Sequence, residues 1–141
     1  MGDRTLVYED DVLRVYWNER GKYFLSDWLG VFRKGATLRR AYQACIEQAR
    51  ARRPSVWLAD TTKIPVLDPV DAKWVAEWFL PEFARAGVRY MAGVSPQAAV
   101  SRMSTKRATE GHESVLEIST HATRAEAEAA IATWWKKHEN D

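Results

Sequence analysis

Asp60 is the side chain of this sequence whose position best suits chemistry. It ends the apolar run VWLA, and a carboxylate at the carboxyl end of a central strand lies where open α/β sheets place their ligands. The residues that could surround it are Thr61 and three aromatic residues, Trp57, Trp74 and Trp78, whose rings could line an apolar pocket. We name these five residues as a candidate site for a ligand or a protein partner. The structural alternative, which we favour for the carboxylate and the rings, is a loop-capping role for Asp60 and a core position for the tryptophans.

Histidine and serine offer a weaker candidate for nucleophilic chemistry. His112, His121 and His138 are too far apart to suggest a metal site, and no cysteine stands at metal-ligand spacing from them. Ser114 and Ser119 lie near two of these histidines and could form a nucleophile and base, but no nucleophile elbow surrounds them. We interpret them as surface loop residues, and we expect no catalytic residue and no metal.

Phosphate-binding and cofactor motifs are missing from the sequence. The turns between strands and helices contain neither G-x-G-x-x-G nor G-x-x-x-x-G-K-[ST]. The single cysteine, Cys45, lies in a helical pattern among apolar residues and is interpreted as a small buried hydrophobe rather than a reactive thiol. We therefore expect a non-enzymatic protein without a cofactor.

The charge balance gives little reason to expect a polyanionic partner. The 21 basic and 19 acidic side chains leave a net charge of only +2. One predicted helix has a basic face, interrupted by Glu47 and without an aromatic platform, so we expect no nucleic acid. An acidic protein partner is more plausible for its arginines, which are Arg39, Arg40, Arg50, Arg52 and Arg53.

The size and composition indicate one globular domain over residues 1–141, with its core at about 12–138. The N-terminus has no apolar segment of the signal-peptide type, and no run of about 18 apolar residues is present. These features predict a cytoplasmic protein with no membrane span. Seven tryptophans are spread over the whole length, which indicates that they share one core and that some of their rings lie at its solvent-exposed margin.

The periodicity of the apolar residues predicts alternating strands and helices. Strands are expected at residues 12–17, 23–28, 56–62, 90–94 and 115–119. Helices are expected at residues 36–53, 68–87 and 95–107, and from residue 123 onward, where Thr123 and Glu126 form a capping box. This order favours an α/β fold, with one mixed sheet of about five strands and about four helices packed on it.

The segment between the two central strands has the clearest local signals. Asp68 suits a helix N-cap, and Pro69 follows it at the first helical position. Pro81 lies inside the apolar stripe, where it removes one backbone hydrogen bond and should kink or divide the helix near Leu80. Gly87 is expected to cap its end.

The arrangement of several motifs resembles a known family. A second strand YFLSDW leads to an early helix, a central strand contains LAD, the second helix carries tryptophans, and the last helix reads AEAEAAIATWW. Together these resemble the STAS-like domains, the fold of anti-sigma-factor antagonists and sulfate-transporter tails, over nearly the whole chain. The resemblance is strongest to small stand-alone bacterial proteins whose last helix also ends in tryptophan. It implies a regulatory role exerted through protein contacts.

The sequence departs from this family at the start of the second helix. Signalling STAS domains carry a phosphorylatable Ser or Thr there, where the positive end of the helix favours a phosphate. The corresponding segment is VLDPVDA, and no hydroxyl residue occurs between residues 65 and 72. We therefore expect no phosphorylation switch at this position.

Two functional hypotheses follow from these observations. The first is a STAS-like protein-interaction or regulatory module without the usual phosphoacceptor loop, with a protein partner and self-association as a homodimer. Tryptophan and arginine, which are enriched at interface hot spots, support it. The alternative is a module that binds a small lipophilic ligand and resembles a CRAL-TRIO-type lobe, with the Trp and Phe side chains around a cavity.

Overall fold

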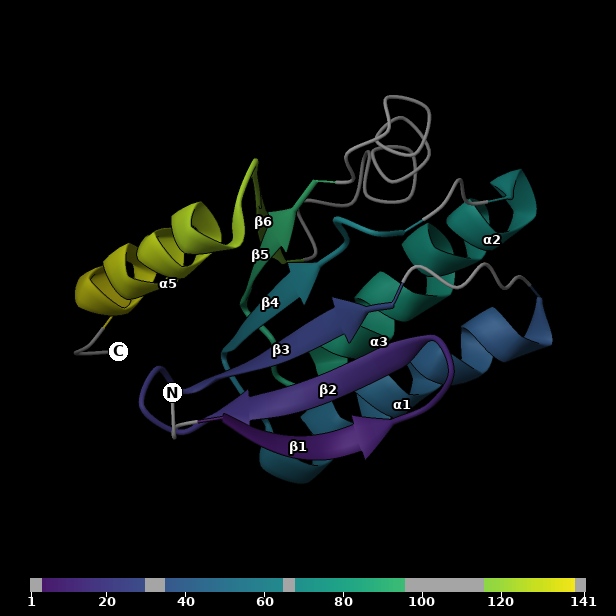
Figure 1. Cartoon of the computed structure of the whole chain (residues 1–141), viewed down its shortest axis with the longest axis horizontal. Helices are drawn as coiled ribbons and strands as arrows, with labels where there is room; N and C mark the ends of the chain where they lie inside the picture. Colours follow the sequence, from purple (N-terminus) through teal and green to yellow (C-terminus); the bar gives the residue numbers. More distant parts are fainter. Residues whose placement is uncertain (1–3, 30–34, 65–67, 96–115, 139–141) are drawn as a thin grey trace.

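A computed structural model describes residues 4–29, 35–64, 68–95 and 116–138. Its centre is one six-stranded sheet in which the strands lie side by side in chain order (Figure 1). The first three strands form an antiparallel meander: β1 Arg4–Glu9, β2 Leu13–Asn18 and β3 Tyr23–Trp28. The other three run parallel to β3: β4 Val56–Asp60, β5 Tyr90–Val94 and β6 Glu117–His121.

The described helices lie on both faces of this sheet. Helix α1 (Ala36–Arg52) follows β3, and α5 (Arg124–His138) follows β6. Between β4 and β5 lies one continuous helical segment, which we call the α2–α3 helix: α2 Pro69–Trp74, the π-helical turn η1 Val75–Phe79 and α3 Leu80–Arg85. Helix α1 and the α2–α3 helix cover the helix-pair face of the sheet, and α5 covers part of the opposite face, the α5 face (Figure 1).

The predicted fold class is confirmed: the chain is α/β with a single mixed sheet. Two predicted strands, 23–28 and 90–94, have the observed bounds. The bounds of the other three predicted strands differ from the observed bounds by one or two residues. The sheet has six strands rather than about five because β1 was not expected. The predicted helix at residues 95–107 lies almost entirely outside the described residues. Within the ranges given above, no helix is both long and apolar enough to cross a membrane.

The predicted helix ends are also observed. The Val70 backbone N–H donates to the Asp68 carboxylate at 2.8 Å, so Asp68 is the N-cap of α2. Gly87 has a φ of +111°, a conformation that favours glycine at the end of a helix. The Glu126 N–H donates to the Thr123 hydroxyl at 3.1 Å, as in a capping box.

The π-helical turn lies where Pro81 was expected to disturb the helix. Proline has no N–H to donate to the carbonyl four residues earlier. The preceding turn accordingly widens, and the Leu80 N–H donates to the Val75 carbonyl, five residues back. The helix therefore continues through the proline as a short π segment between two α-helical segments, instead of ending there.

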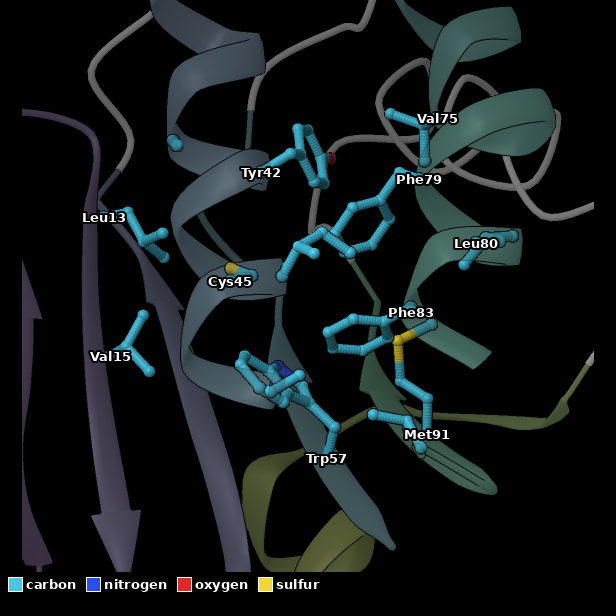
Figure 2. Packing of buried hydrophobic residues seen from close by; sticks show 14 of the residues in the cluster. Leu13, Val15, Tyr42, Cys45, Trp57, Val75, Phe79, Leu80, Phe83 and Met91 are labelled. Atoms are coloured by element: carbon cyan, nitrogen blue, oxygen red, sulfur yellow. The ribbon is translucent and has the colours of Figure 1, made fainter. Parts of the chain in front are cut away.

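The helix-pair face carries the larger core, and that core is aromatic (Figure 2). Trp57 on β4 lies between Phe24 on β3 and Phe83 on the α2–α3 helix, with ring centroids 4.9 and 4.6 Å away. Phe83 stacks on Phe79, and Phe79 contacts Tyr42 on α1. Contiguous rings from the sheet and both helices thus fix the positions of these layers relative to one another.

Cys45 belongs to the same core, as expected. Its side chain is buried on α1, and burial raises the pKa of the thiol far above its ordinary value. A buried thiol of this kind stays protonated and behaves as a small hydrophobe.

The α5 face has a smaller core. It is formed by alternate residues of the central strands together with Ala127, Ile131 and Trp134 of α5. The contributions of the strands are Tyr23, Leu25, Val56, Leu58, Tyr90, Ala92 and Val94. Because β4 is almost completely buried on both faces, it is the central strand that its unbroken apolar sequence predicted.

Candidate functional site

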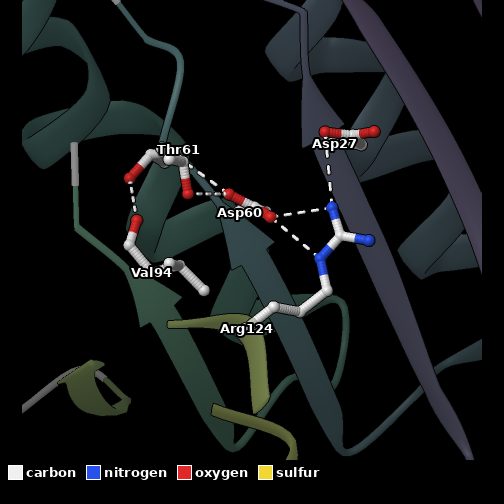
Figure 3. Close-up of polar contacts among 6 residues, drawn as sticks. Asp27, Asp60, Thr61, Val94 and Arg124 are labelled. Carbon is white, nitrogen blue, oxygen red and sulfur yellow. Dashed lines mark hydrogen bonds and ion pairs between the residues drawn. The ribbon is translucent and has the colours of Figure 1, made fainter. Parts of the chain in front are cut away.

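Two carboxylates meet where β3 and β4 end. Asp27 and Asp60 are direct neighbours in the parallel register, and both side chains lie on the α5 face. Like charges at adjacent positions of two paired strands destabilise a sheet unless a cation lies between them. Arg124, the first residue of α5, supplies that cation (Figure 3). Its Nε and Nη2 atoms lie 2.9 and 2.7 Å from Asp60 Oδ2, and Nη2 is 3.6 Å from Asp27 Oδ1.

The second oxygen of Asp60 is also occupied. The Thr62 backbone N–H donates to Oδ1 at 3.0 Å, and the Thr62 hydroxyl donates to the same atom. Burial alone would raise the pKa of this carboxyl, but the hydrogen bonds from Thr62 and Arg124 outweigh burial and lower the pKa. Asp60 is therefore an ionised carboxylate that caps its loop and anchors α5, and neither of its oxygens is left for a ligand.

Thr61 connects the two central strands. Its backbone N–H and its hydroxyl both donate to the Val94 carbonyl at the end of β5 (Figure 3). Its side chain lies on the helix-pair face and contributes to a cavity there. Neighbouring residues of one strand point to opposite faces, so Thr61 and Asp60 do not share a site.

The cavity beneath the helix pair is small. It has a volume of about 60 Å³ and is lined mainly by aromatic and aliphatic side chains, with Trp57 and Thr61 among them. Sites for drug-sized ligands usually measure about 300–1,000 Å³. The Trp57 indole N–H donates to the Ser26 hydroxyl at 2.9 Å, so the ring is held in place. This cavity gives the lipophilic-ligand hypothesis no support.

Trp74 and Trp78 do not line that cavity: Trp74 is half-buried against the edge of the core, where its ring contacts Tyr42, and Trp78 lies outside it at the surface of the α2–α3 helix. Their rings are stacked, with centroids 4.9 Å apart and an interplanar angle of 21°. Trp78 is 36% exposed, whereas Trp57 is 1% exposed. The five residues named from the sequence therefore occupy three places: Trp57 and Thr61 at the cavity, Asp60 on the α5 face, and the Trp74–Trp78 pair at the outer edge of the core.

The Trp74 ring is held by an arginine from α1. The Arg39 guanidinium lies over it at 5.2 Å, which is a cation–π contact. Arg39 Nε is also 3.5 Å from a carboxylate oxygen of Asp71, a buried side chain that accepts a hydrogen bond from the Gly35 N–H. The exposed Trp78 therefore stacks on a half-buried ring, Trp74, which residues of two helices hold in place.

A serine and a histidine meet on β6. Ser119 Oγ lies 2.8 Å from His121 Nε2, and the Tyr90 hydroxyl is hydrogen-bonded to the same serine. The interpretation of Ser119 as a surface loop residue was wrong, because both residues belong to a strand and are half-buried. Ser114 and His112 lie outside the described residues. None of the described pockets contains the Ser119–His121 pair, and no carboxylate is bonded to His121 among the described residues, so the pair lacks the environment of a nucleophile.

Sequence reasoning missed Asp27 and Arg124. Asp27 precedes the last residue of a predicted strand, and Arg124 immediately follows the capping threonine of the last helix. Two carboxylates at adjacent positions of paired strands require a neighbouring cation, and Arg124 in the first turn of the last helix supplies it. The sequence does not show that β3 pairs with β4, so it does not show that the two carboxylates are adjacent.

Comparison with known proteins provides no relative. The chain matches no protein-family model, no curated protein and no solved structure. Among the described residues, no group of three or more His, Cys, Asp or Glu side chains could hold a metal ion. Among the described residues, the surface carries an exposed tryptophan, Trp78, stacked on the half-buried Trp74.

Proposed function

We propose that this chain is a STAS-like protein-interaction module whose docking surface is the tryptophan stripe, defined as Val70, Trp74 and Trp78. Val70 and Trp74 are four residues apart in α2, and Trp78, in the π-helical turn that follows, stacks on Trp74. The exposed large hydrophobic side chains of the described residues are Val70, Trp78 and Leu6, so two of the three belong to the stripe. The exposed Trp78 ring, stacked on the half-buried Trp74, is the observation that carries the proposal.

The stripe has the physical properties of an interface hot spot. Tryptophan and arginine are enriched at such positions, and a large apolar ring loses little entropy on binding when it is already held in place. The contact with Arg39 and the ion pair of Arg39 with Asp71 hold Trp74 in this way. The surface is therefore preorganised for a flat apolar partner.

A second copy of the chain is the partner that fits the charges beside the stripe. Lys73 and Glu77 are both exposed and lie on the same flank of the stripe, four residues apart. If two copies pack their stripes antiparallel about a two-fold axis, Lys73 of each copy faces Glu77 of the other. Opposite charges then meet twice across one apolar contact, which favours a symmetric homodimer.

The strand order also supports the STAS-like part of the proposal. From β3 onward the strands are parallel and follow chain order, as expected for a chain built from successive strand–helix units. The start of α2 is capped by Asp68 rather than by a hydroxyl residue. A module of this kind would form its contacts constitutively, without phosphorylation at that helix.

Sedimentation velocity at micromolar concentrations tests the proposal. We expect the wild type to form a dimer, the Trp78→Ser variant to be a monomer with unchanged far-ultraviolet circular dichroism, and Leu6→Ser to remain a dimer. Leu6 is the matched control because it is the exposed large hydrophobe outside the stripe. A wild type that stays monomeric at high micromolar concentration would overturn the proposal, and so would a Leu6→Ser variant that dissociates equally.

A charge exchange tests the geometry of the dimer. Lys73→Glu should weaken the dimer, because it places two carboxylates opposite each other at each end of the contact. The double variant Lys73→Glu/Glu77→Lys should restore the dimer, because the opposite charges meet again. A double variant that dimerises no better than the single one would exclude the antiparallel arrangement.

A further inference from the structure

Helix α5 leaves part of its face of the sheet uncovered. It packs against β4, β5 and β6, whereas β1 and β2 extend beyond it (Figure 1). A hollow of about 280 Å³ lies at this step, between α5 and the β1–β2–β3 meander. We call it the α5 hollow. Its lining residues come from four strands and from α5, so the sheet and the helix shape it together.

The lining of the α5 hollow is mostly polar. Five of its described residues have charged or polar side chains, namely Arg4, Asn18, Tyr23, Arg124 and Glu128. The other two, Leu25 and Leu58, are 2% and 0% exposed, so they offer little apolar surface to an occupant. A ligand in this hollow would therefore be held chiefly by charge and by hydrogen bonds.

Two side chains of opposite charge line the hollow without contacting each other. Arg4 reaches it from β1, and Glu128 reaches it from α5. Among the described residues, neither side chain forms an ion pair. The Arg4 guanidinium lies over the Tyr16 ring at 5.0 Å, a contact that holds its flat face and leaves the N–H groups at its edge for a ligand.

Arg124 adds hydrogen-bond donors to the hollow but no net positive charge. Its Nε and Nη2 atoms contact the carboxylates of Asp60 and Asp27, which balance its charge. The remaining amino group, Nη1, contacts neither carboxylate. The charges of Arg4 and Glu128 cancel each other, so a dianion such as phosphate finds no excess of positive charge here.

A buried hydroxyl group lies among these side chains. Tyr23 is 7% exposed, and its oxygen accepts a hydrogen bond from Asn18 Nδ2 at 3.2 Å. The Asn18 amide is fixed in this orientation, because the Gly21 N–H donates to its Oδ1 at 2.7 Å. The hydroxyl hydrogen of Tyr23 has no acceptor among the described residues. Burial raises the pKa of Tyr23, and Glu128 raises it further, so the hydroxyl keeps a hydrogen that it can donate to a ligand.

We propose that the α5 hollow binds a small zwitterion, an amino acid or a related amine–carboxylate. The ligand carboxylate would accept hydrogen bonds from Arg4, with Tyr23 as a further donor, and the ligand ammonium group would lie at Glu128. The volume corresponds to about nine water molecules, so a ligand of roughly nine non-hydrogen atoms fills the hollow. A molecule with both charges satisfies Arg4 and Glu128 at once, whereas a simple anion or cation leaves one of them without a partner.

Amide-detected NMR titration of the wild-type protein with a panel of free α-amino acids and ω-amino acids tests the proposal. At millimolar concentrations, at least one of them should shift the signals of residues at the hollow, such as Asn18 and Glu128. The N-acetyl derivative of that ligand lacks the ammonium charge, and its primary amide lacks the carboxylate charge. Each derivative should bind on the order of tenfold more weakly, because one charged hydrogen-bonding partner is lost.

Two single variants separate the contributions of the two charges. Glu128→Gln should abolish the preference for the free amine over its N-acetyl derivative, and it should keep the preference for the carboxylate over its amide. Arg4→Gln should do the reverse, because it removes the cation that meets the carboxylate. Both side chains are exposed, so neither substitution disturbs the core.

The matched controls are Glu47→Gln and Arg14→Gln. They make the same changes at exposed side chains that do not line the hollow, and they should keep both preferences. No shift with any member of the panel, loss of both preferences in each hollow variant, or equal losses in the controls would overturn the proposal. Tighter binding of inorganic phosphate than of every zwitterion would overturn it as well. None of these variants alters the tryptophan stripe, so the result is independent of the dimer.

Discussion

The helix-pair face and the α5 face are built from the same strands but are completed in different ways. On the helix-pair face, a layer of two helices closes over contiguous rings, and the Trp57–Ser26 hydrogen bond is buried among them. On the α5 face, a single helix covers part of the sheet and is tied down by charges through Asp27, Asp60 and Arg124. The first face is fixed mainly by packing, and the second mainly by polar contacts at its edges.

This difference assigns separate tasks to the two faces. Aromatic packing on the helix-pair face supplies most of the buried apolar area and so most of the stability. On the α5 face, one helix is anchored by charge at its first turn and leaves part of the sheet uncovered. A face held by a few directional contacts is also easier to alter by mutation without losing the fold.

Replacing Phe83 should have the largest effect on this comparison. Phe83→Ala removes a completely buried ring between Trp57 and Phe79, and we expect it to lower the free energy of unfolding by about 3–5 kcal/mol. Ile131→Ala on the α5 face should cost less, about 2–3 kcal/mol, because the core there is smaller and only one helix covers it, so the site can relax more easily. Urea denaturation measures both values. Equal losses, or a larger loss for Ile131→Ala, would contradict the division between the faces.

Removing the carboxylate of Asp60 should have an intermediate effect. Asp60→Ala leaves the Arg124 guanidinium with only the longer contact to Asp27, and we expect a loss of about 2 kcal/mol at neutral pH. The loss is smaller than for a fully buried pair, because a third of the Arg124 side chain is exposed. Urea denaturation at neutral pH tests this value, with Asp68→Ala, an exposed cap, as a comparison that should cost about 1 kcal/mol.

The effect of Asp60 should depend on pH in a defined direction. The pKa of this carboxyl is lowered in the folded protein, so its contribution is complete above the unfolded pKa of about 4 and disappears as the pH falls through the folded value. The difference in unfolding free energy between wild type and Asp60→Ala should therefore shrink at acidic pH. A difference that stays constant between neutral and acidic pH would show that Asp60 acts through packing rather than charge.

Single hydroxyl groups on the two faces should give the smallest effects. Ser26→Ala leaves the buried Trp57 N–H without its acceptor, which should cost about 1–2 kcal/mol. Tyr90→Phe should cost about 0.5–1 kcal/mol, because Ser119 keeps His121 as a partner. The comparison is made by thermal denaturation of both variants. A larger loss for Tyr90→Phe would show that the α5 face depends on this hydroxyl network more than its exposure indicates.

Most of the fold could be predicted from local sequence signals. The strands with a buried face, the proline-capped start of α2 and the irregular turn before Pro81 all have a cause within a few residues. Strand β1 was missed because most of its side chains are exposed, including Leu6, and the two half-buried ones, Val7 and Tyr8, are consecutive rather than alternating. Its position is set by pairing with β2, which lies beyond local sequence.

The candidate site was harder to predict, for a different reason. The sequence placed Asp60 at the end of a central strand, but not the partner that occupies it, because Arg124 is 64 residues further along the chain. The separation of Trp57 from Trp74 and Trp78 depends on which side of the helix faces the sheet. The π-helical turn begins directly after Trp74, and the regular spacing of an α-helix does not describe that segment.

The order of the strands has a consequence for how the chain can fold during synthesis. Each strand pairs with its immediate predecessor, so the sheet can grow at one edge as the chain leaves the ribosome, starting from the β1–β2–β3 meander. When each new strand is synthesised, the strand with which it pairs in the native sheet already precedes it in the chain. Arg124 is translated after all six strands, so its contacts with Asp27 and Asp60 form on strands already synthesised. We expect the nascent chain to gain protease resistance stepwise and to reach its final resistance only after α5 has emerged.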